Sequence, residues 1–352
     1  MSVMNTINFK LKALLLLMFL CLVSCGGGGS SSEKNTIVSP ASNAPASTTI
    51  QGILDSAISN NIDGIFVYVD QTSKFDESYA AGLQDKTSNV PAEATTLFKI
   101  ASVSKLFIAV SATKLVVQEQ LSLNDTLSSW LPEWADRIEN SNTITIKQLI
   151  QHRSGIADFD SQVGFSWQNA HTDIDATLAF ALDKPSDFVP DSKYEYSNTN
   201  YLLLAKVLDK ALGYSHQTFI AENILTPLAM HDTYLELSDI ESSLLAKGYW
   251  ENIERSAQDY VIPGGSMIST VKDIAIFIRA LNTGSLLSNE ERAIYSSIYW
   301  FNHSGWLPGY QSIANYHSDI DAVVIQFINT TGNGSENTAN STYQKILKLL
   351  GA

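Results

Sequence analysis

Strand-like patterns of hydrophobic residues stand near both ends of the chain. Residues 64–70 form an aromatic and β-branched run that predicts a strand, and residues 77–82 are expected to return antiparallel to it. Residues 312–316 and 322–327 alternate like adjacent strands, and a helical pattern over residues 342–350 follows them. A sheet is therefore expected to draw its strands from both ends of the chain.

Helix-like spacing precedes the first strand at residues 50–58 and dominates the middle of the chain from residue 121 to about residue 249. The clearest helical patterns of this middle region cover residues 146–152, 174–182, 201–212 and 218–230. This order predicts an α/β (α+β) domain over residues 50–352. Its α/β part would comprise about 50–110 and 260–352, with a mostly helical part inserted at about 111–259.

The N-terminus has the pattern of an export signal. Lys10 and Lys12 precede an apolar run over residues 13–23 that is too short for a membrane span, and a small residue then precedes Cys25. This pattern predicts a signal peptide at residues 1–24 and resembles a bacterial lipobox, in which the cysteine after the cleavage point is lipidated. Ordinary signal peptidase cleavage nearby is the alternative.

A polar linker is expected to follow the lipidated cysteine. Residues 25–49 begin with Cys25, continue with Gly and Ser, and end in a mixture of Pro, Ala, Ser and Thr that is typical of a flexible tether. The chain has two cysteines, Cys21 and Cys25, so no disulfide is expected in the folded domain. We therefore expect an exported bacterial lipoprotein, in the periplasm or at the outer membrane, with the membrane as a partner through its lipid.

Composition narrows the classes of partner and chemistry. The chain has 352 residues and a formal net charge of −14, which argues against nucleic acid as a partner. About 300 residues remain after the linker, enough for one large domain. The sequence has no Gly-x-Ser-x-Gly elbow, no His-Glu-x-x-His motif, no clustered Cys and His set, and no glycine-rich phosphate loop after a strand. We therefore expect neither a metal nor a cofactor.

Ser102 and Lys105 are the leading candidates for catalysis. Residues three apart on a helix lie on one face, so the lysine nitrogen can reach the serine oxygen and act as its base. Residues 106–117 are apolar nearly all round, which predicts a buried helix, and burial would lower the pKa of Lys105 toward that of a general base. The same Ser-x-x-Lys spacing begins at Ser31, in a polar Ser-rich stretch, and at Ser269, before an ordinary capped helix.

Two further polar groups stand in predicted loops. Tyr196 and Asn198 precede a helical pattern, and a phenol near an ammonium would have a lowered pKa and could shuttle a proton. His303-Ser304-Gly305 comes just before the late strands, where a glycine lets a substrate approach the backbone. Each group alone is common in turns and caps. The other histidines stand singly and are interpreted as surface or structural residues, with His152 at a predicted helix end.

Taken in order, these motifs resemble the serine β-lactamase and penicillin-binding protein superfamily. The resemblance is to the branch that holds class C β-lactamases, D-alanyl-D-alanine carboxypeptidases and related esterases, and it covers about residues 50–352. Supporting family-like phrases stand at residues 97–105, 121–125, 146–156 and 263–270. The resemblance implies an antiparallel sheet flanked by N- and C-terminal helices, with an inserted mostly helical domain.

The resemblance also implies a role for each motif residue. Ser102 would be the nucleophile, Lys105 its proton acceptor, and Tyr196 the group that delivers the proton to the leaving group and later activates water. The backbone N–H groups of Ser102 and Trp306 would form the oxyanion hole. Substrate would be held by four residues from two motifs, Asn198, His303, Ser304 and Gly305.

The last of these motifs, His303-Ser304-Gly305, indicates the class of substrate. Class C β-lactamases have Lys-Thr-Gly where this chain has His303-Ser304-Gly305, and a histidine is mostly neutral at pH 7. Weak carboxylate recognition favours a D-alanyl-D-alanine carboxypeptidase-like or esterase-like serine hydrolase acting on a small molecule or a peptide, such as a peptidoglycan stem peptide. Three alternatives stay open: a class C β-lactamase, a non-catalytic penicillin-binding or sensing protein, and a surface adhesin or scaffold.

Overall fold

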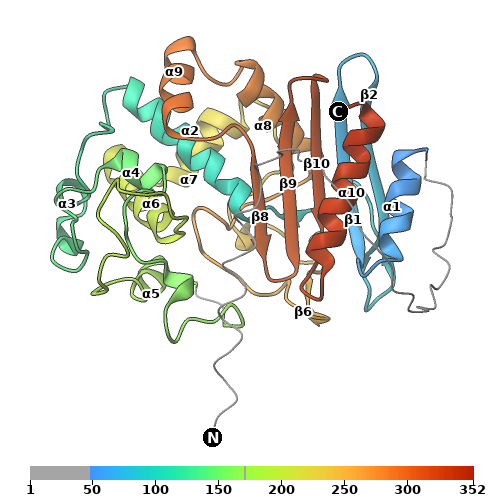
Figure 1. Cartoon of the computed structure of the whole chain (residues 1–352), viewed down its shortest axis with the longest axis horizontal. Helices are drawn as coiled ribbons and strands as arrows, with labels where there is room; N and C mark the ends of the chain where they lie inside the picture. The colour runs from blue at the N-terminus through green and yellow to red at the C-terminus, as the bar shows by residue number, and fades with distance from the viewer. Residues whose placement is uncertain (1–47, 170–171) are drawn as a thin grey trace, which may run out of the picture. The chain divides into compact units, whose positions relative to one another are not determined.

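A six-stranded antiparallel sheet joins the two ends of the folded chain in the computed structural model, which describes residues 48–169 and 172–352 (Figure 1). The strand order is β3-β2-β1-β10-β9-β8. The strands are β1 (Gly64–Gln71), β2 (Phe75–Asp85), β3 (Val90–Pro91), β8 (His303–Leu307), β9 (Tyr310–His317) and β10 (Ala322–Ile328). The pairing of β1 with β10, with Val67 opposite Gln326, confirms that one sheet is built from both chain ends.

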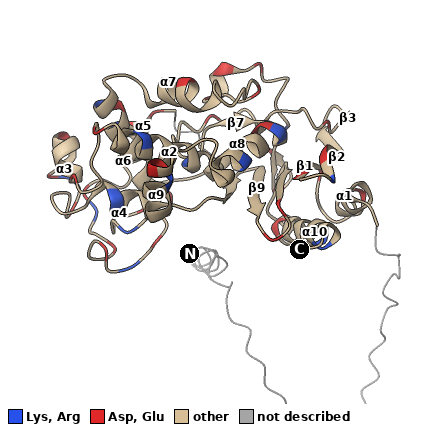
Figure 2. Cartoon of the chain, turned by 90° about the horizontal axis from the view of Figure 1, so that it is seen from above, with Lys and Arg blue, Asp and Glu red and all other residues tan. Residues whose placement is uncertain are grey.

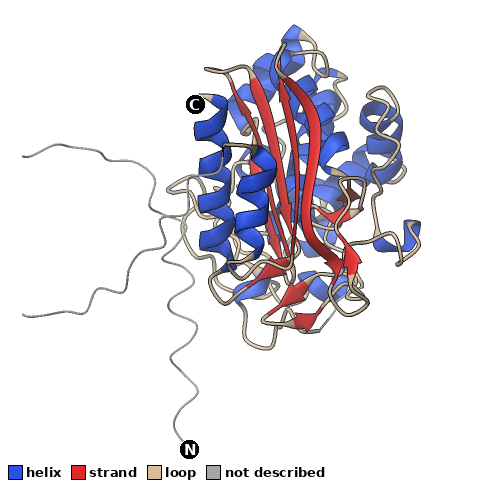
Figure 3. Cartoon of the chain, turned by 90° about the vertical axis from the view of Figure 1, so that its right-hand side faces the viewer, coloured by secondary structure: helices blue, strands red, loops and turns tan. Residues whose placement is uncertain are grey.

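Side chains of the central strands alternate between two hydrophobic cores. Ile65, Val67 and Val69 of β1 face the core formed with α1 (Ile50–Ile58) and α10 (Ser335–Leu350). Phe66 and Tyr68 face the other core, on the side of α8 (Val271–Thr283). Figure 3 shows α1 and α10 side by side over one face of the sheet. The sheet flanked by N- and C-terminal helices is therefore confirmed.

The larger core runs without interruption from the sheet into the helical part, so the described domain is one compact unit. Its central helix is α2 (Ser104–Val117), which is buried on nearly every side as the sequence predicts. Two hydroxyls of this helix, those of Ser111 and Thr113, donate to carbonyls four residues earlier. The other α-helices are α3 (Leu127–Trp130), α4 (Ile146–Ile150), α5 (Ile174–Leu178), α6 (Thr199–Leu212), α7 (His216–Ile220) and α9 (Asn289–Ile298).

Short elements complete the described chain. The remaining strands are β4 (Phe98–Lys99), β5 (Tyr249–Trp250), β6 (Ile253–Glu254), β7 (Ile268–Ser269) and β11 (Thr330–Thr331). The 3₁₀ turns are η1 (Ala101–Val103), η2 (Pro132–Trp134), η3 (Phe159–Ser161) and η5 (Leu237–Asp239), and η4 (Ala221–Leu225) is a π-helical turn. Within the ranges given above, no helix is long and apolar enough to cross a bilayer.

Some predicted helices are shorter in the structure. The pattern at residues 218–230 predicts one helix, but α7 ends at Ile220 and η4 at Leu225, ahead of Pro227, which has no N–H to donate. The helix predicted over 146–152 ends at Ile150, before His152 with its positive φ of 56°. Residues 303–307 were expected to precede the late strands, and instead they are the edge strand β8, because pairing with β9 overrides a His-Ser-Gly sequence with little strand preference.

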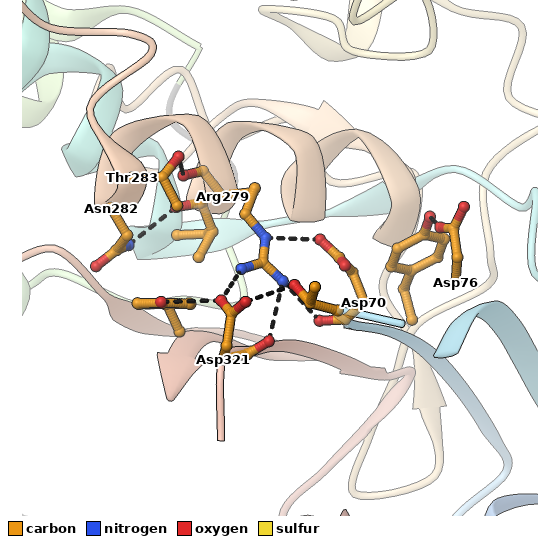
Figure 4. Close-up of polar contacts among 10 residues, drawn as sticks. Asp70, Asp76, Arg279, Asn282, Thr283 and Asp321 are labelled. Carbon is orange, nitrogen blue, oxygen red and sulfur yellow. Dashed lines mark hydrogen bonds and ion pairs between the residues drawn. The ribbon is translucent and has the colours of Figure 1, made fainter. Parts of the chain in front are cut away.

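Charged residues lie along helices and loops of both parts of the domain, with acidic and basic side chains interspersed (Figure 2). One group ties α8 to the sheet. The guanidinium of Arg279 donates from Nε to Asp70 Oδ2 at 2.7 Å and also pairs with Asp321 (Figure 4). A second contact, from Nη2 to the carbonyl of Asp70 at 2.9 Å, makes the connection to β1 bidentate. This group fixes α8 across the ends of β1 and β10.

Candidate active site

Ser102 lies in η1, one turn before α2, rather than on the α-helix itself. Its neighbour Ala101 has a positive φ of 51°, so the chain turns sharply where the nucleophile candidate stands. Residues i and i+3 eclipse in a 3₁₀ turn. Lys105, in the first turn of α2, therefore still reaches Ser102, with 3.1 Å between Nζ and Oγ. The predicted contact is present, although the local structure that makes it differs from the predicted helix.

Lys105 is the most enclosed charged group of the site, with 1% of its surface exposed. Its Nζ also contacts Asn198 Oδ1 at 2.8 Å and the carbonyl of Gly264 at 3.0 Å. Loss of hydration lowers the pKa of Lys105 to about 7, against the opposing attraction of Asp158 and Asp160. The amine is therefore neutral in a large fraction of molecules near pH 7.

Tyr196 donates its O–H to Ser102 Oγ at 2.9 Å, so the phenol and the amine converge on one oxygen. We expected the ammonium to lower the pKa of this phenol, and that expectation is wrong. Desolvation, reinforced by Tyr299, raises the pKa of Tyr196 well above 10. Tyr196 therefore keeps its proton at neutral pH and faces Ser102 as a donor. Its ring stacks on the ring of His152 with centroids 4.3 Å apart.

His303 has both ring nitrogens engaged. Nδ1–H donates to the carbonyl of Ser304 at 2.5 Å, which leaves Nε2 to accept the O–H of Tyr299 at 3.0 Å. Desolvation and the nearby Lys105 lower the pKa of His303 to about 4. The imidazole is therefore neutral throughout the physiological range, and it offers no positive charge to a substrate carboxylate.

Gly305 brings β8 against η1. A Cβ at this position would lie 2.5 Å from the carbonyl of Ile100 and 2.8 Å from the Cβ of Ala101. The glycine is therefore needed for β8 to pack beside the turn that holds Ser102. From the sequence, a different reason was expected for this glycine, the approach of a substrate to the backbone. Ser304, its neighbour, is exposed on the outer edge of β8.

The backbone N–H groups of Trp306 and Ser304 lie on the same side of strand β8. A two-residue turn, Pro308-Gly309, joins β8 to β9 and makes Leu307 and Tyr310 a hydrogen-bonded pair. Opposite pairs alternate along an antiparallel ladder, so the N–H groups of Ser304 and Trp306 face outward from the sheet edge. Strand β8 packs against η1, which holds Ser102.

Asn198 stands at the N-cap of α6 and is engaged at both ends of its amide. Oδ1 accepts from Lys105, and Nδ2 donates to Asp160 Oδ2 at 3.3 Å. Its backbone N–H donates to Asp158 Oδ1 at 2.9 Å. The structure therefore brings Ser102, Lys105, Tyr196 and Asn198 into one connected network.

Three residues beside this network were not predicted as site residues from the sequence. Asp158 and Asp160 stand on the loop before and within η3, and His152 is buried, accepting the N–H of Ser197 at Nδ1 over 3.2 Å. A structural role for His152 agrees with its sequence interpretation. In the sequence, the two aspartates are visible only as two carboxylates two residues apart after the Ser154-Gly155 turn. That spacing does not predict that they face Asn198.

The competing Ser-x-x-Lys spacing that lies among the described residues, at Ser269, does not form such a network. Ser269 lies in β7, and its Oγ bonds with Thr233 Oγ1 at 2.8 Å. Ser31 lies outside the described residues, as do the predicted signal peptide, Cys25 and nearly all of the linker. Across residues 48–169 and 172–352, no group of three or more His, Cys, Asp or Glu side chains is arranged to hold a metal ion.

The fold and the Ser–Lys–Tyr arrangement are those of the β-lactamase and penicillin-binding protein superfamily. The family model described as Beta-lactamase matches residues 48–297, so the chain belongs to the β-lactamase family.

Individual relatives show the breadth of that family. Protein flp of Staphylococcus aureus (strain MW2) is 32% identical over 191 residues, which are 54% of this chain and 38% of that protein. Penicillin-binding protein 4* of Bacillus subtilis (strain 168) is 28% identical over 191 residues, or 53% of this chain and 41% of that protein. The chain thus spans less than half the length of these curated relatives.

Among solved structures, the D-amino acid amidase from Ochrobactrum anthropi SV3 has a TM-score of 0.74 at 23% identity. The match covers 86% of this chain and 97% of that chain. A likeness at this identity shows a shared fold, and it confirms the β-lactamase/transpeptidase-like architecture predicted from the sequence.

Proposed function

We propose that this protein hydrolyses an amide or ester through an acyl-enzyme on Ser102, with Lys105 as the base and Tyr196 as the acid. Ser102 Oγ forms a bond to the substrate carbonyl carbon while its proton passes to Lys105 Nζ. The bond to the leaving nitrogen or oxygen then breaks, and the leaving atom takes a proton from Tyr196, which recovers one from Lys105. In the second half, water attacks the acyl carbon, the bond from that carbon to Ser102 Oγ breaks, and the proton lost by the water passes to Ser102 Oγ as the carboxylic acid is released.

The hydrogen bonds of Lys105 carry this proposal. A neutral amine has two N–H donors and one lone pair. Two partners of Nζ, the carbonyls of Asn198 and Gly264, can only accept, so they use both donors. The lone pair then remains for the O–H of Ser102, the third partner at 3.1 Å. The neutral amine therefore satisfies every contact with the serine proton directed at the base.

Tyr196 completes the proton path. Because its pKa is raised, the phenol stays protonated at neutral pH, and its O–H already points at Ser102 Oγ. The N–H groups of Ser102 and Trp306 are proposed as the oxyanion hole, since β8 packs against η1 and the N–H of Trp306 is not used in pairing with β9. Removing one such donor typically reduces the rate by about 10²–10³-fold.

The substrate proposed is a D-amino-acid peptide or amide, or a small ester. A neutral His303 supplies no charge for a substrate carboxylate, which a β-lactam carries and which also ends a D-alanyl-D-alanine peptide, and this supports esterase-like or amidase-like hydrolysis over class C β-lactamase activity. The likeness to an amidase of D-amino acids points the same way, by analogy of fold. The second candidate is slow turnover, in which the protein binds penicillin and acts as a sensor.

Covalent labelling tests the proposal. A fluorophosphonate or fluorescent penicillin should label one serine, and Ser102→Ala should abolish the label. Ser269→Ala is the matched control because it removes a serine with the same Ser-x-x-Lys spacing but no lysine contact in the structure. Labelling that survives Ser102→Ala would refute the assignment. Intact-mass detection across a D-Ala-D-Ala peptide, a penicillin, a cephalosporin and a short acyl ester would then rank the substrates.

We also propose export and lipid anchoring through Cys25, on the sequence pattern of residues 1–25. Labelled palmitate fed to bacteria expressing the protein should be incorporated, and Cys25→Ser should remove the label. Incorporation that is equal in Cys25→Ser and in wild type would contradict the anchor.

A further inference from the structure

Two aspartates hold Asn198 from the side opposite Lys105. Asp158 receives the backbone N–H of Asn198 at 2.9 Å, and Asp160 receives its side-chain N–H at 3.3 Å. The remaining side-chain atom, Oδ1, accepts from Lys105 at 2.8 Å. The amide therefore connects the carboxylate of Asp160 to the proposed base, and its orientation is set at both ends.

The loop that carries these aspartates is itself tied to α6. The N–H of Phe159 donates to Thr199 Oγ1 at 2.9 Å, and the same hydroxyl donates to the carbonyl of Ala157 at 2.9 Å. Ser154 Oγ donates to Asn200 Oδ1 at 2.7 Å. Because Thr199 and Asn200 directly follow Asn198, loop and helix hold one another in register, and the aspartates have little freedom to leave Asn198.

The two carboxyls also interact with each other. Desolvation and Asp160 together raise the pKa of Asp158 well above its usual range. Attraction by Asp158 and Asp160 opposes the desolvation that lowers the pKa of Lys105, and the Asn198 amide links Asp160 to that amine. The other titratable groups around the amine are Tyr196, Tyr201 on α6, His152 after α4 and His303 on β8, and all four are neutral at pH 7.

We propose that Asp160, held by Asp158, is a positioning residue that fixes the Asn198 amide and through it aims the Lys105 amine at Ser102, while its charge supports the protonated amine. This inference rests on the proposed function of Lys105 as the base. If the side-chain amide of Asn198 rotated by half a turn, its Nδ2 N–H would face Lys105 Nζ in place of Oδ1. Lys105 would then lose one of the two acceptors that direct its lone pair to Ser102.

The charge part of the proposal is tested by titrating Lys105 directly. The protein is labelled with ¹³Cε-lysine, and the Lys105 signal is assigned by its loss in Lys105→Arg. We expect a midpoint near the pKa of about 7 in wild type. In an Asp158→Asn background, where no second carboxyl can take over the charge, Asp160→Asn should lower that midpoint by about one unit, since an opposite charge nearby favours the ammonium. Asp160→Glu keeps the charge and should leave the midpoint within about 0.3 units of wild type.

Two internal controls accompany the titration. Asp136→Asn makes the same change at an exposed site and should not move the midpoint. Lys99, whose pKa burial lowers to about 8, faces Asp259, Glu254 and Lys247 instead, so its signal should stay in place in Asp160→Asn. A Lys105 midpoint unchanged by Asp160→Asn in the Asp158→Asn background, or shifted equally in Asp136→Asn, would overturn the proposal.

The positioning part is tested by a double-mutant cycle on the acylation rate. Asp160→Asn should slow acylation of Ser102 about tenfold in the wild-type background and less than about twofold in the Asn198→Ala background, because its effect passes through Asn198. Equal slowing in both backgrounds would show a merely structural residue. If Ser102 is never acylated while Lys105 still titrates near 7 and responds to Asp160, then the proposed function fails and the charge coupling stands.

Discussion

Gly305→Ala is the perturbation that most directly tests how the site is built. The new Cβ would lie 2.5 Å from the Ile100 carbonyl, 2.5 Å from Ser312 Oγ and 2.8 Å from Ala101 Cβ, whereas ordinary contacts begin at 3.4 Å. Two of these three atoms are in or beside the η1 turn. The strand must therefore move by roughly 1 Å away from Ser102, because backbone cannot rotate aside as a flexible side chain can.

The expected loss is larger in rate than in stability. Overpacking of this kind lowers the free energy of unfolding by about 1–3 kcal/mol, or about 2–6 °C in Tm for a domain of this size. Moving Trp306 N–H away from the oxyanion should slow acylation about 10²–10³-fold, as the loss of one donor does. Folded protein with a slow reaction is therefore the predicted phenotype.

The assay follows acylation by a fluorescent penicillin or an activated ester in the pre-steady state, beside a thermal scan. Gly265→Ala is the matched control, because a Cβ there would meet no atom closer than 3.7 Å. We expect Gly265→Ala to acylate within about threefold of wild type. The reasoning would be refuted by a Gly305→Ala protein that acylates as fast as its control.

Three further outcomes are expected. The acylation rate of wild type should rise with pH through about 7, the pKa of Lys105, because only the neutral amine accepts the serine proton; a rate independent of pH from 5.5 to 8.5 would contradict Lys105 as the base. The contribution of His303 to the KM for a carboxylate-bearing substrate, measured as the ratio of the KM of His303→Asn to that of wild type, should be flat from about pH 5.5 to 7.5, because His303 with a pKa of about 4 stays neutral; a ratio that falls over this interval would show a titrating histidine. Arg279→Ala should lower the free energy of unfolding by about 1–2 kcal/mol, since its ion pairs are partly exposed, without changing the acylation rate. Because the pKa of Asp321 is lowered in the folded protein, that stability difference should be present near neutral pH and shrink as pH falls through the lowered pKa; a difference that persists at pH 2 would exclude the ion pairs as its source.

The sequence predicted the architecture well where hydrophobic periodicity was strong. Strands β1, β9 and β10 and helices α1, α2 and α8 stand where their patterns place them, because each element has a face that must be buried. It predicted β8 poorly, since a short edge strand that begins His-Ser-Gly gains its conformation from β9. Helix ends within the inserted part were also displaced, at His152 and before Pro227.

The predicted site residues meet in space, but several of their expected properties do not hold. Tyr196 has a raised pKa rather than a lowered one, because a phenolate in this enclosed position would lose more hydration than Lys105 returns. His303 was considered for the anionic end of a substrate, and its two nitrogens are used by Tyr299 and Ser304. Spacing along the chain carries no information about desolvation or about partners from distant segments.

The sequence by itself determined the fold and the residues that meet at the candidate active site. Ser102 and Lys105 are three residues apart, so any helical turn brings them together, and the two strand-bearing ends must pair to bury their apolar faces. Only the tertiary structure decided the protonation states, and it did so by enclosing Lys105 among Asn198, Gly264 and Ser102. It also decided that Asp158 and Asp160 face Asn198, because contacts between α6 and the loop at residues 157–160 depend on how the whole core packs.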